Sequence, residues 1–197
     1  MFRTFTTFLA TAFDNSISGR EDSDNMYFTH DPAIAYGTTD TNQNLTVGDA
    51  NLMITCRRLS RYLMSKGAHY GARTGGNIRE NYENPDYNVV CATYVAIALW
   101  QSGILTEDFI NKYAYNWTGI YDAENPYHGI PDMLTDAGWT TVPLSEAKEG
   151  DVLVKNKVHA AIYAGNGLVW EQSTGVIGDG SPPTGEPHDY GGDFGGY

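Results

Sequence analysis

Residues 150–173 read GDVLVKNKVHAAIYAGNGLVWEQS, and this stretch decides the fold class. Short apolar runs alternate here with turn residues, a pattern that is typical of antiparallel strands. The sequence Gly165-Asn166-Gly167 is the strongest turn signal and predicts a tight hairpin. We therefore expect an antiparallel meander in the C-terminal half of the chain.

Helices are predicted ahead of these strands. Residues 89–103, VVCATYVAIALWQSG, are apolar on nearly every face and predict a buried helix. Residues 46–67 repeat apolar side chains at helical spacing and predict an amphipathic helix. TEDFINKYAYN and GIPDMLTDAGW add shorter helices, whereas residues 68–88 are interpreted as a Gly- and Asn-rich loop. Helices followed by strands predict an α+β domain.

The chain of 197 residues suits one domain with terminal additions. Residues 1–44 are polar, acidic and turn-rich, without helical or strand periodicity. We interpret them as an N-terminal extension, and three roles stay open for it: it covers the cleft, docks to a larger assembly, or is part of a chain cut from a longer parent. Residues 45–175 form the predicted domain. Residues 176–197 are rich in Gly and Pro and are predicted to be an irregular tail.

The charge of the chain excludes one class of partner. A formal net charge of −12, from 12 Lys plus Arg against 24 Asp plus Glu, offers no basic patch for phosphates, so we do not expect nucleic acid binding. No apolar run is long enough for a membrane span. No pair of histidines has the spacing of a zinc helix, and we expect neither a metal nor a cofactor.

The two cysteines differ in their sequence context. Cys91 stands where the buried helix begins, so its thiol would face the positive end of the helix dipole, which favours the reactive thiolate. The backbone N–H of Cys91 would also be available to an oxyanion. Cys56 is interpreted as a small buried hydrophobic residue, although the sequence alone leaves open a disulfide between the two.

A base for the thiol must come from elsewhere in the chain. Among the five histidines, His159 is the best placed, because strand alternation puts it on one face with Ala161 and Tyr163. Across the hairpin, Glu171 is expected about level with His159, where a carboxylate would orient the imidazole. The alternative interpretation is a core histidine satisfied by a backbone carbonyl, with Glu171 as a solvated strand residue.

These motifs resemble a known family. A Cys at the head of an apolar helix, then a GDV strand, then H-x-x-I-Y-x-G-N-G, is similar to the NlpC-type peptidases and the related CHAP amidases, which have a papain-like fold. The resemblance covers roughly residues 68–173. It implies that Cys91 is the nucleophile, His159 the base and Glu171 the third polar residue of the site. Glu171-Gln172-Ser173 also resembles the E-x-N end of the CHAP pattern, with Ser173 in place of Asn.

The chain departs from the family pattern around the nucleophile. Where the family commonly has D-C-S-G, this sequence has Val90, Cys91, Ala92 and Thr93. The resemblance still implies the catalytic roles. It leaves undecided whether the usual subsite for the free amine of the substrate is present. The family also places a Tyr near the oxyanion, and Tyr70 in AHYGARTGG is the matching candidate, separated from Cys91 by a longer gap than usual.

The resemblance implies a cysteine hydrolase that cleaves an amide bond of bacterial peptidoglycan, acting outside the cell, at the cell wall or on a virion. Whether the bond lies within the peptide or between peptide and sugar stays open. Two alternatives also stay open. One is an acyltransferase on the same fold, and the other is a catalytically silent binding or virion module.

Overall fold

The computed structural model describes residues 25–30, 48–72, 76–119, 129–173 and 186–189, which form an α+β arrangement. The helices are α2 (Gly48–Ser65), α3 (Ile78–Glu83), α4 (Cys91–Gln101), α5 (Glu107–Ile110) and α6 (Ile130–Asp136), with a 3₁₀ turn η1 at Leu144–Glu146. The strands are β1 (Asn25–Thr29), β2 (Thr140–Val142), β3 (Val152–Lys155), β4 (His159–Gly165), β5 (Leu168–Trp170) and β6 (His188–Asp189).

The strands form one antiparallel sheet in the order β2-β1-β3-β4-β5-β6. The meander β3-β4-β5 confirms the prediction for residues 150–173. Asn166 and Gly167 both have positive φ, 55° and 76°, as a two-residue hairpin turn with the right twist requires. The turn pairs Gly165 with Leu168, and a β-bulge between Tyr163 and Gly165 then shifts the register by one residue, so that Ile162 pairs with Trp170.

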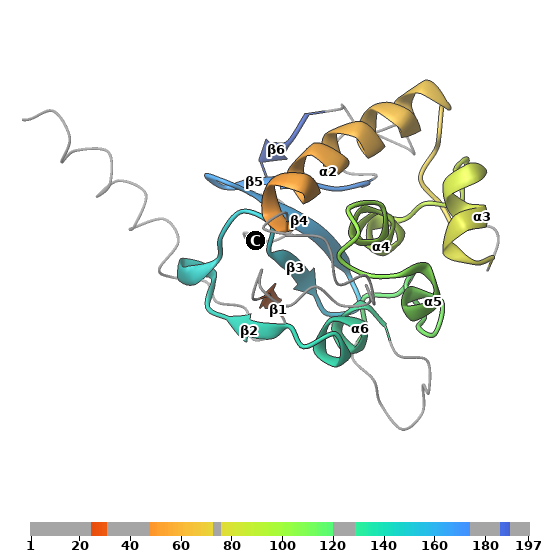
Figure 1. The fold of residues 1–197 in the computed structure, drawn as a ribbon. Coiled ribbons are helices and arrows are strands. Elements are labelled where there is room, and N and C mark those ends of the chain that lie inside the picture. The colour runs from red at the N-terminus through yellow and green to blue at the C-terminus, as the bar shows by residue number, and fades with distance from the viewer. Residues whose placement is uncertain (1–24, 31–47, 73–75, 120–128, 174–185, 190–197) are drawn as a thin grey trace, which may run out of the picture.

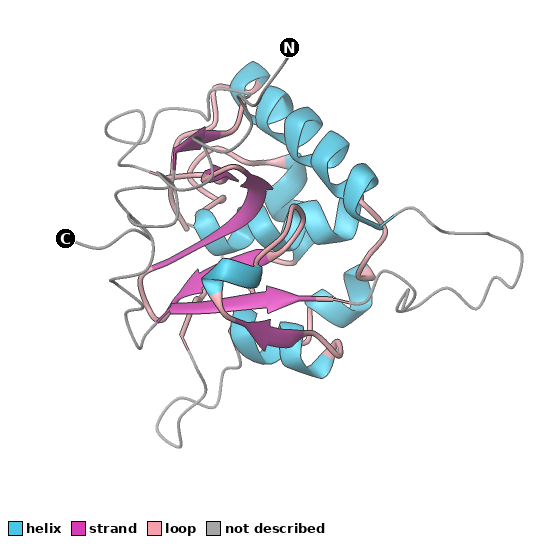
Figure 2. Ribbon diagram, turned by 90° about the vertical axis from the view of Figure 1, so that its left-hand side faces the viewer, coloured by secondary structure: helices cyan, strands magenta, loops and turns pink. Residues whose placement is uncertain are grey.

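The buried helix α4 lies against β4, while α2, α3 and α5 pack against α4 (Figure 1). Figure 1 shows α3 and α5 on the side of α4 that faces away from the sheet. All residues from Cys91 to Leu99 are buried, which explains why this segment is apolar on every face. The prediction of a buried helix is therefore confirmed, and Figure 2 shows the helices and the sheet from a second direction.

The sheet has apolar side chains on both faces. Phe28, Val154 and Ile162 belong to the main core beneath the helices, whereas Tyr27 and Leu153 belong to a smaller cluster on the opposite face. Successive side chains of a strand point to opposite faces of the sheet, which explains why the apolar residues divide into two clusters.

The N-terminal extension expected over residues 1–44 is wrong for residues 25–29. These residues form β1, which lies inside the sheet and pairs Tyr27 with both Val142 and Leu153. Only Tyr27 and Phe28 bury large side chains here, so the apolar run is too short to stand out from its polar surroundings. The folded unit therefore includes residues before the expected boundary at 45, and most of residues 1–44 lie outside the described residues.

Two further segments differ from the predictions. Residues 68–88 contain the short helix α3, which begins after Asn77, whose side-chain oxygen accepts from the Glu80 N–H at 2.9 Å. This Asn-x-x-Glu start is a helix signal within a loop-like composition. Residues 176–197, predicted to be an irregular tail, contain the strand β6. This strand has two residues and pairs with β5 through backbone groups, so no side-chain pattern marks it in the sequence. None of the helices in the described part is long and apolar enough to cross a membrane.

Candidate active site

Cys91 is the first residue of α4. The preceding residue, Val90, is extended and gives no side-chain cap to the helix. The first N–H groups of a helix lack partners within it, and α4 therefore begins with free donors and the positive end of its dipole at Cys91. The Cys91 side chain is only 4% exposed. The expectation that this thiol stands at a helix start is confirmed.

His159 and Glu171 meet beside the helix start. His159 is the first residue of β4, and its Nε2 contacts Oε2 of Glu171, which follows the last residue of β5. Both side chains are buried, at 5% and 4% exposure. Glu171 is thus not a solvated strand residue, and His159 has a carboxylate partner rather than only a backbone carbonyl.

Two details of the predicted geometry are wrong. The pairing of Ile162 with Trp170 sets a register in which Glu171 falls beside Ala161 rather than level with His159. Glu171 and His159 are therefore two positions out of register, and they meet beyond the last paired residues of β4 and β5. The predicted alternation also fails at His159. Ala161 packs on the face away from the helices, whereas His159 contacts Cys91 at the helix start.

Tyr70 completes the cluster. Its hydroxyl donates to the Cys91 sulfur at 3.6 Å. The long sequence gap does not separate the two residues, because Tyr70 pairs with Val89 in a parallel bridge just ahead of α4. The backbone N–H of Tyr87 donates to the carbonyl of His69 at 3.0 Å and so ties the same two segments together.

The segments around Tyr70 approach each other closely. A Cβ added to Gly71 would come within 3.0 Å of the carbonyl oxygen of Tyr87, so glycine permits the approach. Tyr87 itself has a φ of 56°, in the left-handed region that aromatic residues rarely occupy. Such strained conformations persist where the surrounding structure holds them, often near functional sites.

The electrostatics of the cluster favour a charged pair. Burial alone would raise the pKa of Cys91, but hydrogen bonding with His159 and the positive charge of its ring outweigh burial and lower it. Tyr70 and the backbone N–H of Ala160 contribute in the same direction. Burial likewise opposes the charge of His159, but Cys91 and Glu171 raise its pKa to about 10. The lowered pKa of Cys91 and the raised pKa of His159 both favour a thiolate paired with an imidazolium.

The hydrogen bonds assign the two ring nitrogens of His159. Nε2 is engaged with Glu171, which leaves Nδ1 to serve the Cys91 thiol. A carboxylate on one nitrogen fixes the tautomer and the ring orientation and stabilises the cation. The arrangement holds a nucleophile, an acid–base group and an orienting carboxylate. The N–H of Ala160 is a contributor that sequence reasoning missed, because a backbone donor has no residue signature.

The remaining histidines stand apart from this cluster. His69 pairs with Asp86 at 2.8 Å, and His30 stacks on Trp139 with ring centroids 4.2 Å apart. His128 lies outside the described residues, and His188 belongs to β6. Within the described ranges, no group of three or more His, Cys, Asp or Glu residues is arranged to hold a metal ion.

The second cysteine has a different environment. Cys56 is free, as is Cys91, so the alternative of a disulfide between them is wrong. The Cys56 side chain is fully buried on α2, in agreement with its interpretation as a small hydrophobic residue.

Comparison with known proteins adds no family to this geometry. No family model matches the chain, and neither a curated protein nor a solved structure matches it.

Proposed function

We propose that this protein is a papain-like cysteine hydrolase of the NlpC-type family that cleaves an amide bond of bacterial peptidoglycan. The observation that carries the proposal is the cluster in which Cys91, at a helix start, contacts His159, whose other ring nitrogen contacts Glu171. The lowered pKa of Cys91 and the raised pKa of His159 support a nucleophilic thiolate paired with an acid.

The proposed reaction has two halves. The Cys91 thiolate attacks the amide carbonyl carbon, and the resulting oxyanion accepts hydrogen bonds from the Cys91 N–H and the Tyr70 hydroxyl. His159 donates its Nδ1 proton to the leaving amine as the C–N bond breaks, which leaves a thioester on Cys91. His159, now neutral, removes a proton from water, and the hydroxide attacks the thioester to release the acid and restore the thiolate.

The substrate and its location are proposed on the resemblance of the sequence motifs. Peptidoglycan lies outside the cell membrane, so the protein would act extracellularly, at the cell wall or as part of a virion. The family subsite for a free amine is not carried over, because Val90 and Ala92 replace the polar neighbours of the nucleophile. We therefore make no assignment between endopeptidase and amidase.

The test is digestion of purified cell walls of several chemotypes, with mass spectrometry of the released fragments. Wild-type protein is expected to release fragments whose new termini identify the bond, and Cys91→Ala is expected to release none. Cys56→Ala is the matched control, because it removes the other free thiol without touching the cluster. Circular dichroism of each variant checks that the fold is retained.

The same experiment separates the two alternatives. An acyltransferase would form the thioester but transfer it to an added amine faster than to water, which appears as amine-capped fragments. A silent module would release nothing and would form no thioester with any wall preparation. Either result would contradict the hydrolase proposal.

A further inference from the structure

A second candidate site lies between α3, α5 and the segment that follows α5. It is a cavity of about 330 Å³, at the small end of the range for small-molecule sites. Three asparagines and two tyrosines supply most of its lining: Asn77, Asn111, Asn116, Tyr113 and Tyr115. None of them belongs to the Cys91 cluster, so binding at this cavity would not depend on the proposed function.

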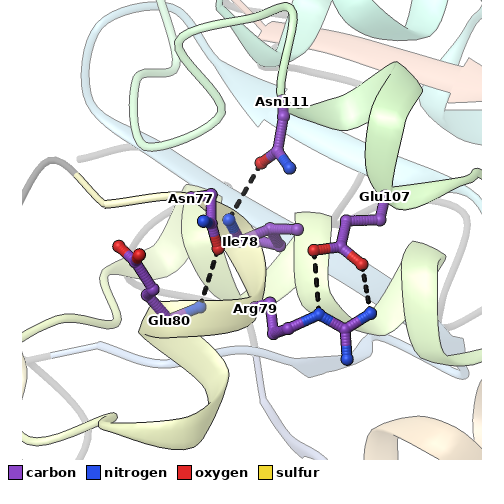
Figure 3. Close-up of polar contacts among 6 residues, drawn as sticks. All are labelled: Asn77, Ile78, Arg79, Glu80, Glu107 and Asn111. Atoms are coloured by element: carbon purple, nitrogen blue, oxygen red, sulfur yellow. Dashed lines mark hydrogen bonds and ion pairs between the residues drawn. The ribbon is translucent and has the colours of Figure 1, made fainter.

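Two of the asparagine amides are held in a fixed orientation. The Asn111 side-chain oxygen accepts from the Ile78 N–H at 2.9 Å, and the Asn77 oxygen accepts from the Glu80 N–H at 2.9 Å. Figure 3 shows both bonds, with Asn111 reaching from the end of α5 to the first turn of α3. Because each oxygen is occupied by a backbone donor, each NH₂ group is left as the free hydrogen-bonding end.

The tyrosines offer rings rather than free hydroxyl groups. The Tyr113 hydroxyl donates to Asp136 at 2.8 Å, and the Tyr115 hydroxyl accepts from Asn81 at 2.8 Å and donates to the Gly76 carbonyl. Burial is the main cause that raises the pKa of both phenols to about 12, so they stay neutral. What they present to a ligand is apolar ring surface.

Ion pairing keeps the surroundings of the cavity neutral and rigid. Arg79 and Glu107 form a two-point ion pair that links α3 to α5 (Figure 3). No lining residue carries a formal charge. The Glu80 carboxylate lies where a Cβ at Gly76 would otherwise stand, so an acceptor approaches the rim. An anionic ligand is therefore disfavoured, also by the net charge of −12.

These features fit a neutral ligand rich in oxygen. Fixed amide donors beside aromatic rings, with an acceptor at the rim, match a molecule whose hydroxyl groups both accept and donate and whose ring carbons are apolar. The cross-links between α3 and α5 hold the donors in place before binding, which lowers the entropic cost of binding. We infer that this cavity binds one sugar residue of a neutral glycan.

The test is titration of the protein with neutral trisaccharides, starting with the trimers of N-acetylglucosamine and glucose, followed by amide NMR. Saturable shifts are expected at the lining residues and at the side-chain NH₂ signals of Asn77 and Asn111. Cys91→Ala protein is expected to bind equally, so the result does not depend on catalysis. An alanine tripeptide serves as the competing ligand class.

Isosteric variants sharpen the test. Asn77→Asp and Asn111→Asp keep an oxygen for the backbone N–H but replace the NH₂ donor, so thermal stability is expected to hold while affinity falls about tenfold each. Gln101→Glu is the matched control, an exposed amide changed to a carboxylate outside the cavity.

Three outcomes would overturn the inference. They are the absence of saturable shifts with every sugar, unchanged affinity in both Asn→Asp variants, and binding of the tripeptide in place of the sugars.

Discussion

The two cysteines are both buried and both free, yet their surroundings act on the thiol in opposite directions. Burial raises the pKa of Cys56, and the hydrogen bond from the Tyr94 hydroxyl offsets only part of that effect. At Cys91 burial acts in the same direction, but the charge and hydrogen bond of His159 reverse it. A cationic partner, rather than exposure, therefore determines which buried thiol becomes nucleophilic.

Position in the helix adds to this difference. Cys56 lies within α2, where the helix surrounds it on both sides, while Cys91 is the first residue of α4. The dipole and the free N–H donors of a helix act only within its first turn, so they reach Cys91 and not Cys56.

The largest expected effect is a difference in alkylation between the two thiols. With iodoacetamide at neutral pH, Cys91 should react at least about a hundredfold faster than Cys56, because only the thiolate attacks. Peptide mass spectrometry over time measures both rates in one sample. In denaturant the two rates should converge, and equal rates in the native protein would contradict the assigned environments.

Replacement of the imidazole should remove most of the difference. In His159→Gln, burial is no longer opposed by a cation, so the pKa of Cys91 should rise above its ordinary value of 9.0. The alkylation rate at neutral pH should then fall at least about tenfold, since one pKa unit is a tenfold change in thiolate. The pH dependence of alkylation measures the shift. His69→Gln, which alters an imidazole paired with Asp86, should leave the rate unchanged.

Loss of the carboxylate charge should move one limb of the pH profile. The pKa of His159 is raised to about 10 from 6.5, so hydrolysis should decline as pH rises through 10 and the ring loses its proton. Glu171→Gln keeps a hydrogen-bond acceptor but removes the charge, and the alkaline limb should move down by about one pH unit. Glu146→Gln, an exposed carboxylate on η1, is the control. If the alkaline limb does not move in Glu171→Gln, the limb reports the titration of a group other than His159.

The smallest expected effect belongs to Tyr70. Its hydrogen bond to the Cys91 sulfur is long, at 3.6 Å, so Tyr70→Phe should slow hydrolysis about three- to tenfold and raise the thiol pKa slightly. Tyr82→Phe, a tyrosine stacked on Tyr62 away from the cluster, should have no effect. A loss of kcat with an unchanged thiol pKa would show that the Tyr70 hydroxyl acts on the oxyanion alone and does not stabilise the thiolate.

The parts of the fold that the sequence predicts are those with a long local pattern. Residues 91–101 are apolar on nearly every face, and residues 150–173 alternate around a Gly-Asn-Gly turn, so α4 and β3-β4-β5 follow from local rules. β1 and β6 do not, because each is short and owes its place to backbone pairing with distant strands.

The residues of the site likewise differ in how far the sequence predicts them. Cys91 stands out because it begins an apolar helix, and His159 because it is a polar ring on an apolar strand. Glu171 could be paired with His159 through the hairpin, but its offset depends on a register that only the structure gives. Tyr70 has no local signal of its own, and only the family resemblance pointed to it, since its position depends on the bridge to Val89.

The place of β1 between β2 and β3 has a consequence for how the chain folds. Both partners of β1 are synthesised long after it, so the strand must wait for them and then close a long loop, which is a slow step. Until then, the edge of β3 is open to a strand from any molecule. A shortened chain beginning at residue 45 would keep that edge permanently open, so we expect it to exchange strands and aggregate rather than remain monomeric.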